Sequence, residues 1–150
     1  MSYVKNNLMS NENIVYTAKI HWFVFVPGLL LMLIAFANTG QEVDNPLTPF
    51  FWFFGVALFL KAMLEKSSTE MAVTNKRIIA KTGIIKRDTV ELNHNKIESF
   101  NVNQGVFGRI FGYGTITING TGGGKSPIKN IDAPLVFRKN AMEAIDQNGN

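Results

Sequence analysis

The sequence predicts a membrane protein of the α+β class, in which a two-helix transmembrane hairpin precedes a domain of antiparallel strands closed by a C-terminal helix. Three observations predict this class. Two apolar runs, residues 20–37 and 49–64, contain a single Lys and no Arg, Asp or Glu. After residue 67, short strand-like segments alternate with turn residues. The last segment carries apolar residues at helical spacing.

Both apolar runs lack a polar face at helical spacing, which suits lipid, because a chain of 150 residues cannot enclose two such helices in its own core. About 20 helical residues span the hydrocarbon layer, so each run is slightly short. Trp22 and Trp52 suit the interface, and Lys61 can extend toward water. Pro27-Gly28 permits a kink in the first helix.

The orientation of the hairpin follows from its flanking charges. The link 38–48 has Glu42 and Asp44 but no Lys or Arg, whereas Lys and Arg flank both runs, so both termini are expected in the cytoplasm. Residues 1–19 are expected to be a polar cytoplasmic lead without a stable helix, with residues 14–16 touching the membrane surface or the later domain. A cleaved signal peptide ending at residues 35–37 is the alternative, and sequencing the mature N-terminus distinguishes the two.

The remaining chain is predicted to form hairpins and then a helix. We expect strands at residues 67–74, 77–81, 84–92, 96–103, 113–119 and 127–131. Val90 and Leu92 should point inward. Residues 105–112 match neither a strand nor a helix cleanly and are compatible with one helical turn. The final helix begins after Asp132, and its apolar stripe consists of Phe137, Ala141, Ala144 and Ile145.

Composition argues against catalysis and metal binding. Cysteine is absent, which excludes disulfides and thiolate metal sites. Neither His21 nor His94 has Asp, Glu or Cys at the spacing of metal ligands. The sequence also offers no nucleophile paired with a general base. We therefore expect no enzymatic activity, no metal and no cofactor.

The glycine-rich loop at residues 119–126 resembles a phosphate-binding loop only partly. Asn119 occupies the position of the first glycine, and Pro127 follows where a helix would have to begin. We expect a hairpin loop there and no nucleotide. The same loop holds a glycosylation triplet, Asn119-Gly120-Thr121, which would stay unused on the cytoplasmic side.

Basic residues supply the candidate contacts. Five of them lie on adjacent predicted turns and strands: Lys76, Arg77, Lys81, Lys86 and Arg87. They either face the anionic lipid of the membrane or lie on solvent-exposed edges of the sheet. Arg109 is interpreted mainly as a structural residue that bonds backbone carbonyls or Glu98, and alternatively as a partner or headgroup contact. The excess charge is too small, and the aromatics too concentrated in the apolar runs, for nucleic-acid binding.

Several segments resemble the bacterial pleckstrin-homology-like (PH-like) membrane proteins, namely residues 74–79, 81–83, 90–92, 97–99, Val102, Gln104 and 107–116. The Gly-Arg-x-x-Gly-x-Gly-Thr pattern at 108–115 is the most specific part. The resemblance implies a bent antiparallel barrel of about seven strands over residues 67–146, capped by a C-terminal helix and preceded by the hairpin at residues 20–64. It also implies a non-enzymatic protein of a bacterial inner membrane. In eukaryotic PH domains, phosphoinositide binding depends on a basic loop between the first two strands. Only residues 75–77 occupy that position here, so the resemblance does not imply recognition of lipid headgroups.

An anchor, a compact domain and no catalytic constellation favour a binding or scaffolding module that tethers a protein partner or forms a homo-oligomer. The alternative is a sensor of anionic lipid headgroups. A transporter or channel subunit is a weaker hypothesis, because Lys61 is the only ionisable residue in the helices apart from His21 at their edge.

Overall fold

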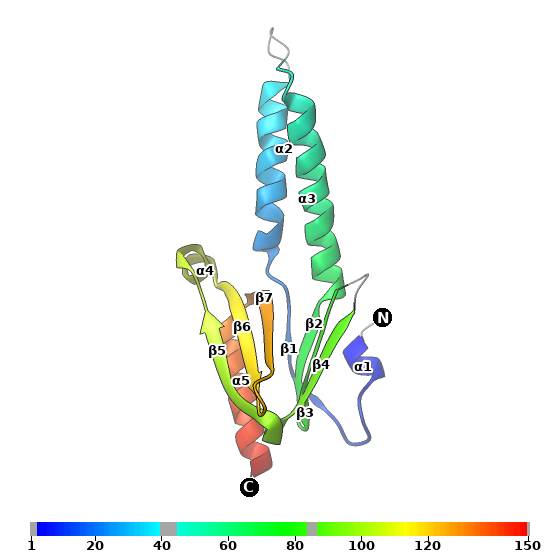
Figure 1. Cartoon of the computed structure of the whole chain (residues 1–150), viewed down its shortest axis with the longest axis vertical. Coiled ribbons are helices and arrows are strands. Elements are labelled where there is room, and N and C mark those ends of the chain that lie inside the picture. Colours follow the sequence, from blue (N-terminus) through cyan, green and yellow to red (C-terminus); the bar gives the residue numbers. More distant parts are fainter. Residues whose placement is uncertain (1–2, 40–44, 84–86, 150) are drawn as a thin grey trace.

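A computed structural model describes residues 3–39, 45–83 and 87–149 of the chain. Two antiparallel sheets form its body, and a pair of helices projects from one end (Figure 1). The elements are α1 (Tyr3–Asn6), β1 (Ile14–Ala18), the 3-10 helix η1 (Trp22–Phe25), α2 (Val26–Asn38), α3 (Thr48–Ser68), β2 (Glu70–Thr74), β3 (Arg77–Thr82), β4 (Asp88–Asn93), the 3-10 helix η2 (His94–Lys96), β5 (Ile97–Asn103), α4 (Val106–Phe111), β6 (Tyr113–Gly120), β7 (Lys125–Asp132) and α5 (Pro134–Gly149).

The first strand of the domain lies before the helical hairpin in the sequence. β1 pairs with β2 in the sheet β1-β2-β3-β4, with Ala18 opposite Met71. Just beyond β1, Ile20 forms a bridge with Ile131 of β7. The predicted division, with residues 1–19 as a lead and the domain confined to 67–146, therefore leaves out β1. The reason is that β1 is short and its pairing partners lie far along the chain, so no local pattern marks it.

The second sheet, β5-β6-β7, packs against the first around one apolar core that α5 closes. Phe137 and Ala141 of the predicted α5 stripe are fully buried. Val90 and Leu92 pack against this core, as predicted. Mixed α and β elements, antiparallel sheets and a C-terminal helix fit the PH-like fold that the resemblance implies.

The helical pair begins later than the sequence predicts. Ile20 and His21 belong to the body, and the helix starts with η1 and continues into α2. Pro27 lies at the start of α2, where its missing N–H costs no helical hydrogen bond, so it does not kink a longer helix. A Cβ on Gly28 would lie 2.8 Å from the Phe59 nitrogen and 3.0 Å from the Gly55 oxygen. Glycine is therefore required there for the close approach of α2 to α3.

Apolar side chains cover the outside of both helices. Leu33 and Phe36 of α2 and Phe53 of α3 are each more than 60% exposed, at 62%, 69% and 69%. Within the described residues, α3 is the one helix whose length and composition would allow it to cross a membrane, and residues 22–38 form a shorter apolar helix. The two apolar runs thus form a helical pair with altered ends, and their crossing of a membrane stays a prediction.

The N-terminal segment covers the outer face of the first sheet. Val4 of α1 is buried together with Ala72 and Ile79 in a small second cluster. In residues 3–19 the α-helix is limited to the single turn α1, which is stabilised by this packing rather than by helix propensity.

Candidate functional site

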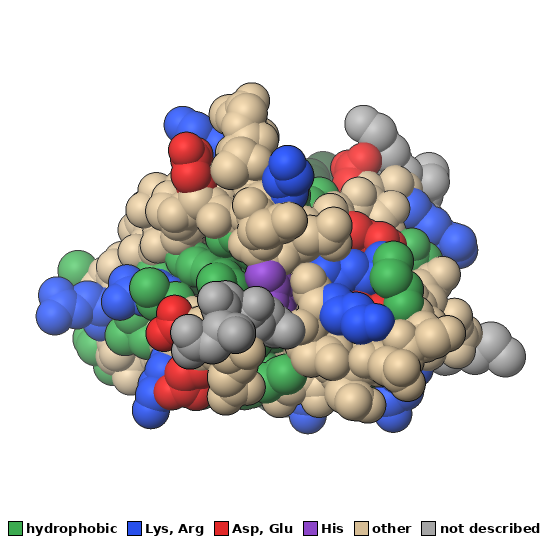
Figure 2. Space-filling view, turned by 90° about the horizontal axis from the view of Figure 1, so that it is seen from below, with side chains coloured by type: hydrophobic (Ala, Val, Ile, Leu, Met, Phe, Trp, Pro, Cys, Tyr) green, Lys and Arg blue, Asp and Glu red, His purple; other side chains and the backbone are tan. Residues whose placement is uncertain are grey.

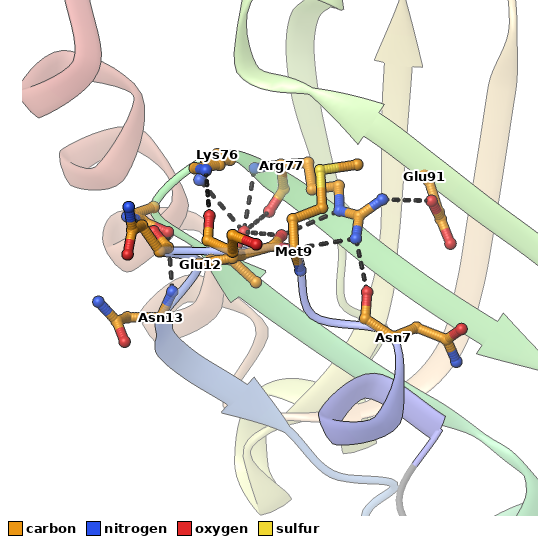
Figure 3. A network of polar contacts seen from close by, with 11 residues as sticks. Asn7, Met9, Glu12, Asn13, Lys76, Arg77 and Glu91 are labelled. Carbon is orange, nitrogen blue, oxygen red and sulfur yellow. Dashed lines mark hydrogen bonds and ion pairs between the residues drawn. The ribbon is translucent and has the colours of Figure 1, made fainter.

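Arg77 lies at the centre of a buried polar network that fixes the N-terminal segment to the first sheet (Figure 3). Its Nε donates to Glu12 Oε1 (2.9 Å) and its Nη2 to Glu12 Oε2 (3.0 Å). Nη1 donates to Glu91 Oε2 (2.6 Å), and Nη2 also donates to the Asn7 carbonyl oxygen (2.8 Å). Arg77 is 5% exposed. Its predicted role as a partner or lipid contact is therefore wrong, because all three guanidinium nitrogens are engaged inside the protein.

The network keeps both partners charged. Burial alone would raise the pKa of Glu12, but hydrogen bonds from Arg77, the Met9 amide and the Thr74 hydroxyl together lower it below the ordinary 4.5. The hydrogen bond to Glu12 raises the pKa of Arg77 above its ordinary value and outweighs the opposing effect of burial. Because the folded-state pKa of Glu12 is depressed, its stabilising contribution is present above pH 4.5 and is lost as the pH falls through the folded value.

The other predicted basic residues do not form one cluster. Lys76, in the turn between β2 and β3, lies at the end of the domain away from the helices, and its Nζ donates to the Ser10 oxygen (2.7 Å). Figure 2 shows that end, where Lys and Arg are spread among acidic and uncharged surface. Lys81 lies over the Tyr3 ring, 5.3 Å from its centre. Arg87 is exposed, and Lys86 lies outside the described residues.

Arg109 does not have the structural role predicted for it. It is exposed on α4, and the described residues provide its side chain with no hydrogen bond or ion pair. Gln104 instead joins α4 to the start of β6, because its Nε2 donates hydrogen bonds to the carbonyl oxygens of Gly108 (3.2 Å) and Tyr113 (3.1 Å). A Cβ on Gly108 would lie 2.6 Å from the Tyr113 oxygen, so the first glycine of the 108–115 pattern permits this approach.

A groove runs between β5 and α5. Its volume is about 420 Å³, within the range of ligand pockets, and it is lined by Ile97, Glu98, Ser99, Phe100, Arg138, Met142, Ile145 and Asp146. β5 is an edge strand that pairs with β6 on one side and with no other described strand. The site residues predicted from the sequence do not include this groove. The signal was present in the spacing of residues 138, 142 and 145 on one helix face, but the sequence does not show which strand lies beside them.

A second hollow of about 500 Å³ lies where α3 meets β7 and the end of β3. Lys61 and Lys129 both line it, together with the apolar side chains of Leu64 and Ile128. Nearby, Asn130 Nδ2 donates to Glu65 Oε1 (3.0 Å), which joins α3 to β7. Two cations thus lie beside the apolar base of the helix, and Glu65 lines the same hollow.

Both histidines lie inside the body. His21 is 7% exposed, and its Nδ1 accepts a hydrogen bond from the Phe23 amide (3.1 Å), which caps η1. His94 begins η2 and is equally buried. Burial lowers the pKa of His94 and outweighs its hydrogen bonds with the backbone of Thr74, Arg77 and Ala144. Among the described residues, no group of three His, Cys, Asp or Glu is placed to hold a metal.

The lowered pKa of His94 predicts a loss of stability in mild acid. Above its ordinary value of 6.5 the imidazole is neutral in both states, and as the pH falls below it the unfolded state binds the proton more readily. The melting temperature of the purified chain should therefore fall between about pH 7.5 and about pH 5.5. A His94→Gln variant should show a flatter profile over this range, measured by circular dichroism. An unchanged slope would contradict the assignment.

Two antiparallel sheets of four and three strands and a closing C-terminal helix fit a PH-like domain. The chain belongs to the Bacterial PH domain family, whose model matches residues 17–148. That match starts within β1 and includes both helices, in agreement with a domain that begins before the hairpin. No curated protein and no solved structure matches the chain.

Proposed function

We propose that this chain is a non-enzymatic, two-pass protein of the bacterial cytoplasmic membrane, which holds a protein partner at the cytoplasmic face through its PH-like domain. The groove between the unpaired edge of β5 and α5 is the observation that carries the binding role. The exposed apolar surface of α2 and α3 is what supports the anchor.

Insertion of the helical pair removes a large apolar surface from water. Burying one large apolar side chain is worth roughly 1.5–3 kcal/mol, and many on α2 and α3 are exposed, Phe36 and Phe53 among them. The absence of Lys and Arg from the link 38–48 favours its placement outside the cell, with both termini inside. A helix of 13 residues preceded by a 3-10 turn is short for a bilayer, which thinning near the protein can accommodate.

Cysteine labelling in intact bacteria tests this topology, because the chain has no cysteine of its own. An Asn45→Cys variant should react with a membrane-impermeant maleimide added to whole cells. A matched Lys139→Cys variant, on the exposed surface of α5, should react only after the membrane is opened. Labelling of both positions in whole cells, or recovery of the protein in the soluble fraction, would contradict the anchor.

The groove suits an extended peptide segment of a partner. Such a segment can add its backbone to the free edge of β5 and place a side chain against Phe100 and Ile145. Glu98 on the strand and Arg138 on the helix offer opposite charges at the rim of the groove. Neither interaction needs a catalytic residue.

Photo-crosslinking in native membranes tests the groove. A photoreactive amino acid at Met142, which lines the groove and is 53% exposed, should give a discrete adduct with one partner. The same group at Lys139 on the neighbouring face of α5 is the control and should give none. An adduct of twice the chain mass would identify the partner as a second copy. Absence of any adduct at Met142 would overturn the role of the groove.

Sensing of anionic lipid is the second candidate function, favoured by the Lys61 and Lys129 hollow at the base of α3. The test uses the full chain, because a fragment beginning at residue 67 would lack β1. In nanodiscs, a Lys129→Gln variant should lose preference for phosphatidylglycerol over phosphatidylcholine, measured by the lipids retained after mild extraction. Equal retention by both proteins would remove this candidate.

A further inference from the structure

α4 exposes an apolar surface that the body of the protein does not cover. Val106 is 74% exposed, Phe107 65%, Ile110 70% and Phe111 42%. Gly108 is the buried residue of this short helix and lies against the Tyr113 backbone. The large side chains of α4 therefore point away from the core, opposite to the arrangement that a soluble surface favours.

This surface lies at the end of the domain from which the helices project. Figure 1 shows α4 close to the level at which α2 begins, so a bilayer spanned by the helices would have its cytoplasmic surface near α4. Phe111 joins the two regions, because its ring centre lies 5.1 Å from that of Phe23 and 6.3 Å from that of Trp22. Trp22 is itself 53% exposed. The apolar surface of α4 is thus continuous with the base of the hairpin.

We infer that α4 inserts its apolar side chains into the cytoplasmic interface of the lipid bilayer and so fixes the orientation of the PH-like domain relative to the membrane. This inference rests on the proposed membrane insertion of α2 and α3. Phe107, Ile110 and Trp22 are side chains that the interface accepts, and Arg109 is an exposed cation on the same helix, which suits anionic headgroups.

Lipid suits this surface better than a protein does. A stable protein interface needs roughly 800 Å² from each partner, which four side chains on one short helix do not supply. A bilayer requires no matching shape, and the hairpin would already hold it in place beside α4. With the hairpin and α4 both in contact with lipid, the β5–α5 groove would face the cytoplasm at a fixed angle.

Depth measurement by spin labelling tests the inference on the full chain. Single-cysteine variants Phe107→Cys and Ile110→Cys place a nitroxide on α4 in nanodiscs of phosphatidylethanolamine and phosphatidylglycerol that hold one copy each. Leu33→Cys in α2 is the lipid-exposed control, and Lys139→Cys in α5 is the water-exposed control. All four positions are exposed, and an unchanged melting temperature shows that each variant is folded.

The expected result is higher accessibility to oxygen than to a nickel chelate at the α4 positions, intermediate between the two controls. If Leu33→Cys reports lipid but both α4 labels report water, this inference is overturned while the membrane anchor stands. If Leu33→Cys reports water, the anchor itself fails and this inference fails with it. If the labels on α4 are shielded from both oxygen and the nickel chelate, α4 contacts protein, and the inference of lipid contact is overturned.

Discussion

Replacing Arg77 with methionine should lower the free energy of unfolding by about 3–5 kcal/mol, the usual cost of removing one partner of a buried ion pair. Methionine preserves much of the volume but leaves the Glu12 carboxylate, whose side chain is 0% exposed, without its main partner. For a chain of this size the melting temperature should fall by about 6–20 °C. Circular dichroism of the full chain in detergent measures the change.

Glu91 provides the matched control for Arg77. Its carboxylate accepts a hydrogen bond from the same guanidinium, but its side chain is 36% exposed. Glu91→Gln should therefore lower the free energy of unfolding by only about 0–1 kcal/mol. The double variant Arg77→Met with Glu12→Gln should recover part of the loss, because no buried charge remains unpaired. Similar losses for Arg77→Met and Glu91→Gln would show that burial of the pair is not what stabilises this region.

Replacing Phe137 with alanine should cost about 3–5 kcal/mol, because the ring is fully buried and its removal leaves a cavity. The ring meets Tyr16 of β1 edge-on, with centres 6.0 Å apart. The loss should therefore also speed amide hydrogen exchange in β1, measured by mass spectrometry of the full chain. Such coupling is expected only if β1 belongs to the same folded unit as α5.

Leu135 is the control for Phe137, since it lies on the same helix and is 55% exposed. Leu135→Ala should change the free energy of unfolding by less than about 0.5 kcal/mol. Protected β1 amides in a destabilised Phe137→Ala variant would contradict the placement of β1 in the core.

The β-hairpins after residue 70 and the C-terminal helix could be predicted because their signals are local. Asn75-Lys76 is the connection between β2 and β3, and Gly83, directly after β3, has a positive φ of 84°. Residues 105–112, whose pattern is compatible with one helical turn, contain α4. Of the candidate contacts, Lys76 and Arg77 look equivalent in sequence, yet one is on the surface and the other is buried.

The apolar helical pair, the turn at residues 75–76 and the amphipathic α5 follow from the sequence, because each depends on residue types at short spacing. The PH-like family follows from the resemblance of several short segments to its members. The three-dimensional fold is needed to see that β1 joins the domain across the hairpin, that Arg77 pairs with Glu12, and that the groove lies between β5 and α5. These features join residues distant along the chain, and local spacing carries no record of such pairings. The outward direction of the α4 side chains also depends on packing, because it is set by the contact of Gly108 with the Tyr113 backbone.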